Sequence, residues 1–115
     1  MELSELAERY SGGTPERCKA IFSTIFIVSN RLQAIFDRHI PRLTLRQFML
    51  LSIARQSAEP LTLTKLGELL GCSRQNVKKL ALALQEKGFA KLRRSDEDAR
   101  ALTLLVTGEA EKYFT

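Results

Sequence analysis

The sequence contains few of the residues from which catalytic and metal sites are built. It has one histidine, His39, and two cysteines, Cys18 and Cys72, which lie far apart in the chain. A metal centre needs more ligands than these residues supply, and neither a Ser/His/Asp set nor a glycine-rich phosphate loop is present. We therefore expect no enzymatic activity, no metal and no cofactor. We interpret His39, just before Pro41, as a residue at the C-terminal end of a helix.

Long apolar runs are missing as well. No stretch reaches the roughly 18 apolar residues of a membrane span, because Asn30 and Arg31 interrupt the most hydrophobic segment. A secretory signal, with its basic start, apolar centre and cleavage site, is not recognisable either. The 115 residues are 44% hydrophobic and 27% charged, without repeats or low-complexity tracts. We therefore expect one compact domain over residues 1–115, located in the cytoplasm and without membrane contact.

The middle of the chain carries two short helical patterns joined by residues 71–73. Gly71 can end the first helix in a left-handed conformation, and Ser73 can cap the second helix by accepting a backbone N–H bond. Gly67 is small enough for the helices to approach closely, and Val77 supplies an apolar side chain opposite it. This arrangement predicts a helix-turn-helix. Helical spacing supports the first helix through Leu66, Leu69 and Leu70.

The second helix separates apolar from polar residues. Its inner stripe follows helical spacing and consists of Val77, Leu80, Ala81 and Leu84. The residues outside the stripe are basic or carry amides: Arg74, Gln75, Asn76, Lys78 and Lys79. Such a face is often no more than the solvated side of a helix. In the first turn of the second helix, however, these side chains occupy the place from which base edges in the major groove are read.

Positive charge is concentrated in the same region. Residues 74–94 contain seven basic side chains and one acidic side chain, a net charge of +6, whereas the whole chain carries +5. A uniformly basic surface would be much less informative. This distribution indicates a polyanionic partner such as DNA.

A charged hairpin follows the second helix. Gly88 is expected to close that helix, and Phe89–Arg93 and Ala101–Val106 are expected as strands joined by the polar tip Arg94–Arg100. The acidic residues of the tip would repel DNA unless they are neutralised. Residues two apart in an extended segment point to the same side, so Asp98 can hold the Arg100 guanidinium for entry into the minor groove. The alternative is an ordinary surface ion pair.

Four motifs in this part of the chain are shared with a known family. They are Leu66–Gly71, Ser73–Val77, Leu84–Phe89 and, as the most specific one, Asp98–Val106 followed by Thr107-Gly108. On these motifs, residues 43–110 resemble the MarR family of bacterial winged helix-turn-helix transcriptional regulators. The resemblance implies a mainly α fold with a small antiparallel wing sheet. It also implies a homodimer, expected to act as a repressor, that binds a pseudo-palindromic operator in double-stranded DNA.

The resemblance further assigns roles to individual residues. The exposed residues at the start of the second helix take the contacts to the major groove and the DNA backbone. Arg100 takes the minor groove, with Asp98 orienting it. The full candidate DNA-binding set is Ser73, Arg74, Gln75, Asn76, Lys78, Lys79, Arg94, Asp98 and Arg100. Effectors in the family are often small aromatic or phenolic anions, although no residue of this sequence specifies one.

The segment before the helix-turn-helix shows further capping signals. Leu43–Leu51 predicts a capped helix, with Thr44 as its N-cap and Gln47 completing a capping box. Pro60 is expected to break this helix. Leu61-Thr62 then predicts a short strand that can pair with the wing, and its threonine can cap the first helix of the helix-turn-helix.

The N-terminal part is expected to be helical and apolar. Glu2–Tyr10 predicts a short helix, Ser11–Gly13 a flexible link and Pro15–Arg38 a long helix. The apolar residues of the long helix are too many for one narrow stripe: Ile21, Phe22, Ile25, Phe26, Val28, Leu32, Ile35 and Phe36. Something must cover them, and a dimer partner is the natural candidate, since this helix belongs to the dimer interface in the family.

Family members usually continue after the wing into two more helices that hold the dimer together, whereas this sequence ends at Thr115. Either the sequence is a fragment, or dimerisation depends on the N-terminal helices, about residues 1–40. Two other functions stay open. One is a winged-helix module that binds protein instead of DNA. The other is an oxidant-sensing regulator that uses Cys18, whose neighbours Arg17 and Lys19 would stabilise a thiolate, whereas Cys72 is expected to pack as a small apolar residue.

Overall fold

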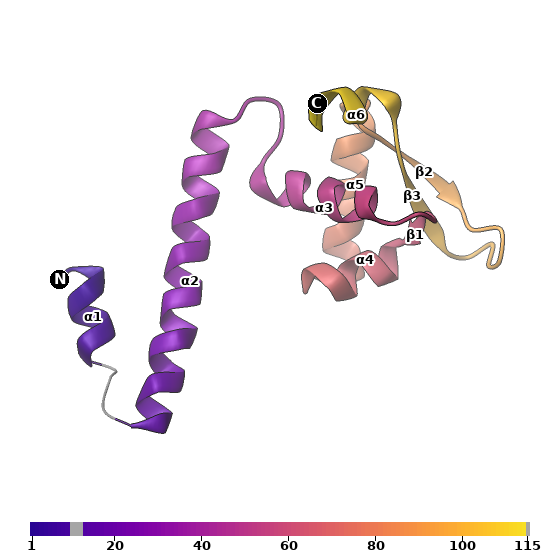
Figure 1. The fold of residues 1–115 in the computed structure, drawn as a ribbon. Helices are drawn as coiled ribbons and strands as arrows, with labels where there is room; N and C mark the ends of the chain where they lie inside the picture. The colour runs from indigo at the N-terminus through magenta and orange to yellow at the C-terminus, as the bar shows by residue number, and fades with distance from the viewer. Residues whose placement is uncertain (10–12, 115) are drawn as a thin grey trace. The chain divides into compact units, whose positions relative to one another are not determined.

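The computed structural model describes residues 1–9 and 13–114. It divides into two compact units, Met1–Pro41 and Arg42–Thr115. Helices make up most of it, and the second unit adds a three-stranded antiparallel sheet (Figure 1). The mainly α fold with a small wing sheet is therefore confirmed. Most of the expected link Ser11–Gly13 lies outside the described residues.

The N-terminal unit consists of helices α1 (Leu3–Arg9) and α2 (Thr14–His39). Helix α2 has Pro15 in its first turn, where a missing N–H costs nothing, and His39 is its last residue, as predicted. Neither helix contains a buried residue. The apolar side chains of α2 are exposed instead, Phe22 by 76% and Ile25 by 64%. Among the described residues, no helix is both long enough and apolar enough to cross a membrane.

The second unit begins with α3 (Leu45–Gln56), and its start follows the predicted capping box. Thr44 Oγ1 accepts from the Gln47 N–H at 3.2 Å, and Gln47 Oε1 accepts from the Thr44 N–H at 3.1 Å. Its end differs from the prediction, because the chain leaves the helix at Ser57, before Pro60 is reached. The Ser57 hydroxyl donates to the Glu59 carbonyl at 2.6 Å, and this local bond favours a turn over a further helical turn.

The helix-turn-helix consists of α4 (Leu63–Leu70) and α5 (Arg74–Glu86). Thr62 caps α4 through the Lys65 N–H at 3.1 Å, as predicted. Gly71 ends α4 with φ at 75°, in the left-handed conformation that glycine adopts without strain. Gly88 ends α5 in the same way, with φ at 84°. Both predicted helix ends are confirmed.

One hydrophobic core holds the second unit together. The largest side chains with almost no exposed surface are Phe89, Leu50, Leu51, Leu63, Leu66, Leu84, Leu104 and Val77. They come from α3, α4, α5, the following turn and the sheet, so each of these elements buries apolar area against the others. The core therefore packs α5 against the sheet at Phe89 and Leu104.

The sheet contains β1 (Leu61–Thr62), β2 (Ala90–Arg94) and β3 (Leu102–Val106) in the order β1-β3-β2. The predicted pairing of residues 61–62 with the wing is confirmed, since β1 is antiparallel to β3. Helix α6 (Gly108–Phe114) follows β3 and packs beside α3. There Arg55 of α3 forms an ion pair with Glu111 at 2.8 Å and lies over the Phe114 ring, 4.6 Å from its centroid.

Candidate nucleic-acid interface

The N-terminal end of α5 is presented to solvent by a tight turn. A Cβ on Gly67 would lie 2.8 Å from the Cys72 carbonyl oxygen and 3.4 Å from the Val77 side chain. Only glycine therefore allows α4 and the turn to approach this closely. Ser73 Oγ caps α5 by accepting from the Asn76 N–H at 3.2 Å. The predicted roles of Gly67, Val77 and Ser73 in the turn are confirmed.

The start of α5 carries polar and basic side chains on its outer surface. Val77, Ala81 and Leu84 are buried, so the helix is fixed with its apolar stripe toward the core. The remaining side chains at its start are all exposed: Arg74, Gln75, Asn76, Lys78 and Lys79. No acidic residue lies in the first turn, and the positive end of the helix dipole adds to the side-chain charge. This surface suits an anionic partner with hydrogen-bonding edges.

The tip of the β2–β3 hairpin differs from the prediction of an extended segment. Residues 98–101 form a turn, in which the Ala101 N–H donates to the Asp98 carbonyl at 3.0 Å. The Asp98 carboxylate accepts from the backbone N–H of Arg100 at 2.9 Å. Among the described residues, no ion pair joins Asp98 to the Arg100 guanidinium. Asp98 thus shapes the backbone of the tip, a common role of aspartate in turns, and the expectation that it holds the guanidinium directly is wrong.

The two neighbouring arginines of β2 lie on opposite faces of the sheet. Leu92 pairs with the buried Leu104, so Leu92 and, two residues on, Arg94 belong to the face against which α5 packs. Arg93 pairs with Thr103 on the other face, where its guanidinium lies 3.9 Å from the Asp96 carboxylate. Arg94 is therefore on the α5 side of the wing, and Arg93 is not.

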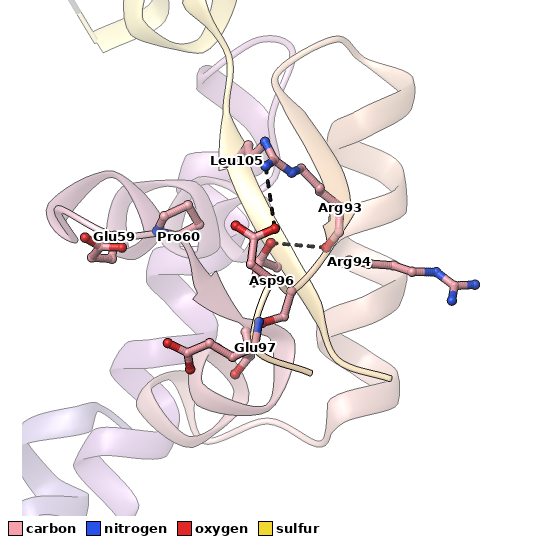
Figure 2. A pocket seen from close by; sticks show the side chains of 10 residues that line it. Glu59, Pro60, Arg93, Arg94, Asp96, Glu97 and Leu105 are labelled. Atoms are coloured by element: carbon pink, nitrogen blue, oxygen red, sulfur yellow. Dashed lines mark hydrogen bonds and ion pairs between the residues drawn. The ribbon is translucent and has the colours of Figure 1, made fainter. Parts of the chain in front are cut away.

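Figure 2 shows a hollow on the face of Arg93. Its lining includes the acidic residues Glu59, Asp96 and Glu97, and the Arg94 side chain is directed away from it (Figure 2). Acidic carboxylates on this face are unfavourable for a phosphate backbone, whereas the face toward α5 carries Arg94. Two of the three tip acids thus line the outer face of the wing, and the third, Asp98, is engaged with backbone.

The wing and the start of α5 lie at the same end of the unit. The chain reverses direction at Gly88, so β2 runs back along α5. Figure 1 shows the hairpin tip at the end where the α4–α5 turn lies. Arg94 at the end of β2 and Arg100 in the tip therefore lie toward the same end of the unit as the exposed start of α5.

Two further side chains, which sequence reasoning did not single out, fix this arrangement. Gln85 Oε1 in the last turn of α5 accepts from the Leu92 N–H at 2.8 Å. Lys87 Nζ donates to Gln47 Oε1 at 2.8 Å and to the Arg42 carbonyl at 2.5 Å. Lys87 is one of the seven cations of the basic segment, and these bonds hold it at the far end of α5. It therefore ties α5 to α3 instead of adding to the charge at the turn.

The two cysteines have different surroundings. Cys72 is half-buried in the helix-turn-helix and packs against the core, as predicted. Cys18 is exposed on α2, and the neighbouring Lys19 lies 3.6 Å from the Glu16 carboxylate. One of the two cations expected to stabilise a thiolate, Lys19, is thus shared with an acid.

Comparison with known proteins agrees with this geometry. The family model described as "MarR family" matches residues 43–102, just over half of the chain. No curated protein sequence matches the chain significantly. The solved structures with the same fold include the transcriptional regulator BldR from Sulfolobus solfataricus. It has a TM-score of 0.80 and 15% identity, over 89% of this chain and 74% of that one.

Two other solved structures show complexes of their own proteins. Reduced AbfR bound to DNA has a TM-score of 0.71 and 20% identity, over 83% of this chain and 70% of AbfR. The PcaV regulator from Streptomyces coelicolor, with its natural ligand, has a TM-score of 0.68 and 18% identity, over 77% of this chain. This chain spans 63% of the length of PcaV. At these identities the likeness shows the fold, and the family match shows the relationship. The chain belongs to the MarR family, whose members are transcriptional regulators and not enzymes.

Proposed function

We propose that this chain represses transcription by binding a pseudo-palindromic DNA operator as a homodimer. The observation that carries the proposal is the exposed start of α5, capped by Ser73 and free of acidic residues in its first turn. AbfR, which has the same fold, was solved bound to DNA. A helix presented in this way fits the major groove, which admits one helix.

The residues of α5 divide into two roles. Arg74, Gln75 and Asn76 read base edges, because guanidinium and amide groups can form paired hydrogen bonds with guanine and adenine. Lys78 and Lys79 contact phosphates, since an ammonium group acts as a point charge without base discrimination. Substitution of the first three should change which sequence is preferred. Substitution of the lysines should weaken binding to all sequences.

The wing supplies the second contact. Arg94 lies on the α5 side of the sheet, and Arg100 is exposed in the turn at the tip. The Asp98 carboxylate fixes the backbone there by accepting from the Arg100 N–H. We assign Arg100 to the minor groove, whose negative potential attracts arginine where it is narrow, and Arg94 to the adjoining phosphates. Asp98 acts on Arg100 through the backbone of the turn.

Dimerisation is assigned to the N-terminal helices, about residues 1–40. Helix α2 exposes seven large apolar side chains: Ile21, Phe22, Ile25, Phe26, Val28, Leu32 and Ile35. A contiguous apolar surface of this kind typically marks a protein interface. A second copy of the chain would bury it and would place two recognition helices on one operator, with half-sites about one DNA turn apart.

An effector is proposed from the comparison with PcaV. PcaV was solved with its natural ligand, and we extend to this chain the expectation of a small aromatic or phenolic anion that changes operator affinity. A panel of such anions, measured by thermal shift of the protein and by release of bound DNA, tests it. If no anion changes either quantity, the effector assignment is abandoned.

Selection of bound duplexes from a random DNA pool tests the central proposal. The expected result is an inverted repeat whose binding weakens steeply as salt increases. Enrichment of a single half-site would contradict the homodimer. Absence of any enrichment, together with no gel shift at low salt, would contradict DNA binding and would favour a winged-helix module that binds protein.

A further inference from the structure

We infer that Gln85 is a positioning residue that sets the angle of the wing relative to the recognition helix. The inference rests on the proposed function, because it concerns how the wing reaches DNA. Gln85 lies at the far end of α5 from the proposed DNA surface, so it acts on binding only through the wing. Its side chain accepts a hydrogen bond from the Leu92 N–H, with 2.8 Å between the Leu92 nitrogen and Gln85 Oε1.

The hydrogen-bond pattern of the hairpin shows why this bond is available. Backbone bonds join Phe89 to Thr107 and Ser95 to Ala101. Hydrogen-bonded pairs alternate with non-bonded pairs along an antiparallel ladder. Between Phe89 and Ser95, the backbone N–H and C=O groups of Lys91 and Arg93 therefore point toward β3. The Leu92 N–H therefore points away from β3, toward the open edge of the sheet. Gln85 occupies that edge and supplies the acceptor that a further strand would otherwise provide.

The location of the bond allows it to restrain the orientation of the wing. Helix α5 and β2 are joined by residues 87–89, where the Gly88 N–H donates to Gln85 O at 3.0 Å and the Phe89 N–H donates to Leu84 O at 2.9 Å. These bonds fix only the start of β2. The Gln85 side chain reaches three residues further along the strand, to Leu92, so the helix and the strand are held at two points. A strand held at two points cannot pivot about its first residue.

Loss of the side-chain acceptor should therefore free the wing while the core remains. Leu92 itself packs against the core, and Phe89 is fully buried. These contacts and the pairing of β2 with β3 maintain the fold, and the Gln85 bond adds a link from α5 to the strand at Leu92. Arg94 follows Leu92 by two residues, and Arg100 lies beyond it. Their distance from the pivot turns a small change of angle into a larger displacement at the tip.

The test compares Gln85→Leu, which has no acceptor, with Gln85→Glu, which retains one. Gln56→Leu, at the exposed end of α3, serves as the control for a glutamine-to-leucine change elsewhere. Amide hydrogen exchange of the full chain without DNA is measured first. Gln85→Leu should speed exchange of the Leu92 amide by about tenfold, and Gln85→Glu and Gln56→Leu should leave it near wild type. Unchanged Leu92 exchange in Gln85→Leu overturns the inference.

The second measurement is the salt dependence of binding to the selected duplex. In wild type, the paired variant Arg94→Ala with Arg100→Ala should reduce the slope by about two phosphate contacts. In Gln85→Leu the same pair should reduce it by less than half as much. An equal reduction in both backgrounds overturns the positioning role alone. No reduction in wild type overturns the wing role in the proposed function, and the positioning role with it, whatever the exchange data show.

Discussion

Gly67 and Cys72 approach so closely that a Cβ on the glycine would lie 2.8 Å from the cysteine carbonyl oxygen. The obstacle is a backbone atom in the turn, which cannot rotate away as a side chain can. The same two residues are joined by a bond from the Cys72 N–H to the Gly67 carbonyl at 2.9 Å. The path of the chain between the two helices is therefore set at this contact.

The first prediction follows from this contact. Gly67→Ala should lower the free energy of unfolding by about 1–3 kcal/mol, the usual cost of overpacking. Gly108→Ala is the control, because a Cβ there meets nothing within 4 Å and its backbone is not left-handed. Urea unfolding of the two variants measures the difference. Equal stability of the two would show that the turn can relax around an added methyl group.

The second prediction separates capping from DNA contact at Ser73. Ser73→Ala removes the acceptor for the Asn76 N–H and should cost about 1 kcal/mol of stability. Ser73→Asp retains a cap, and its negative charge interacts favourably with the helix dipole, so this variant should be as stable as wild type. The added negative charge at the start of α5 should nevertheless abolish binding to the selected duplex. Thermal unfolding measures the stability of each variant, and gel shift measures its binding to the duplex.

Thr62→Ala is the matched control for Ser73→Ala, since Thr62 caps α4 in the same way. It should lower stability by a similar amount and leave DNA affinity closer to wild type. If Ser73→Asp bound DNA as tightly as wild type, the start of α5 would not face the duplex.

The third prediction uses two adjacent arginines as a matched pair. Arg94→Ala should reduce the salt slope of DNA binding by about one, because this side chain lies on the α5 side of the sheet. Arg93→Ala should change the slope much less, since Arg93 faces the outer side, beside Asp96. Fluorescence titrations at several salt concentrations measure both slopes. A larger effect of Arg93 would reverse the assignment of the two faces.

The fourth prediction concerns the exposed apolar surface of α2. Phe22→Ser should weaken self-association by about tenfold or more, as expected when an aromatic residue at an interface is truncated. Asn30→Ser, also exposed on α2, should leave association unchanged. Sedimentation velocity over a range of concentrations measures self-association, and circular dichroism checks that α2 remains helical. A wild-type chain that is monomeric throughout would contradict the assignment of α2 to the dimer.

Features that depend on neighbours in sequence could be predicted from the sequence. The caps at Thr44, Thr62 and Ser73 each bond to a backbone N–H three residues away. Gly71 and Gly88 adopt the left-handed conformation that their places after helical patterns require. Such bonds form within one turn, so the local residue types determine them whatever the rest of the fold does.

Features that depend on tertiary structure could not be predicted in this way. The bond from Lys87 to Gln47 spans 40 residues, and the pair of Arg55 and Glu111 spans 56. At the wing tip, the spacing of Asp98 and Arg100 fits a strand and a turn equally well. The turn is adopted because the carbonyl and the carboxylate of Asp98 accept from the Ala101 N–H and the Arg100 N–H, so both donors are satisfied. Periodicity alone does not contain that information.

The opposite orientations of Arg93 and Arg94 make the charge of the hairpin tolerant of register slippage. A shift of one residue would exchange the faces of β2, and an arginine would still lie on the side of α5. The apolar residues have no such tolerance, because Leu92 would leave the core and lose its pairing with Leu104. An insertion or deletion of one residue in β2 should therefore destabilise the fold because Leu92 loses its burial, and not because the α5 side loses an arginine. The leucines therefore specify the register of this hairpin, whereas its affinity for an anion does not depend on that register.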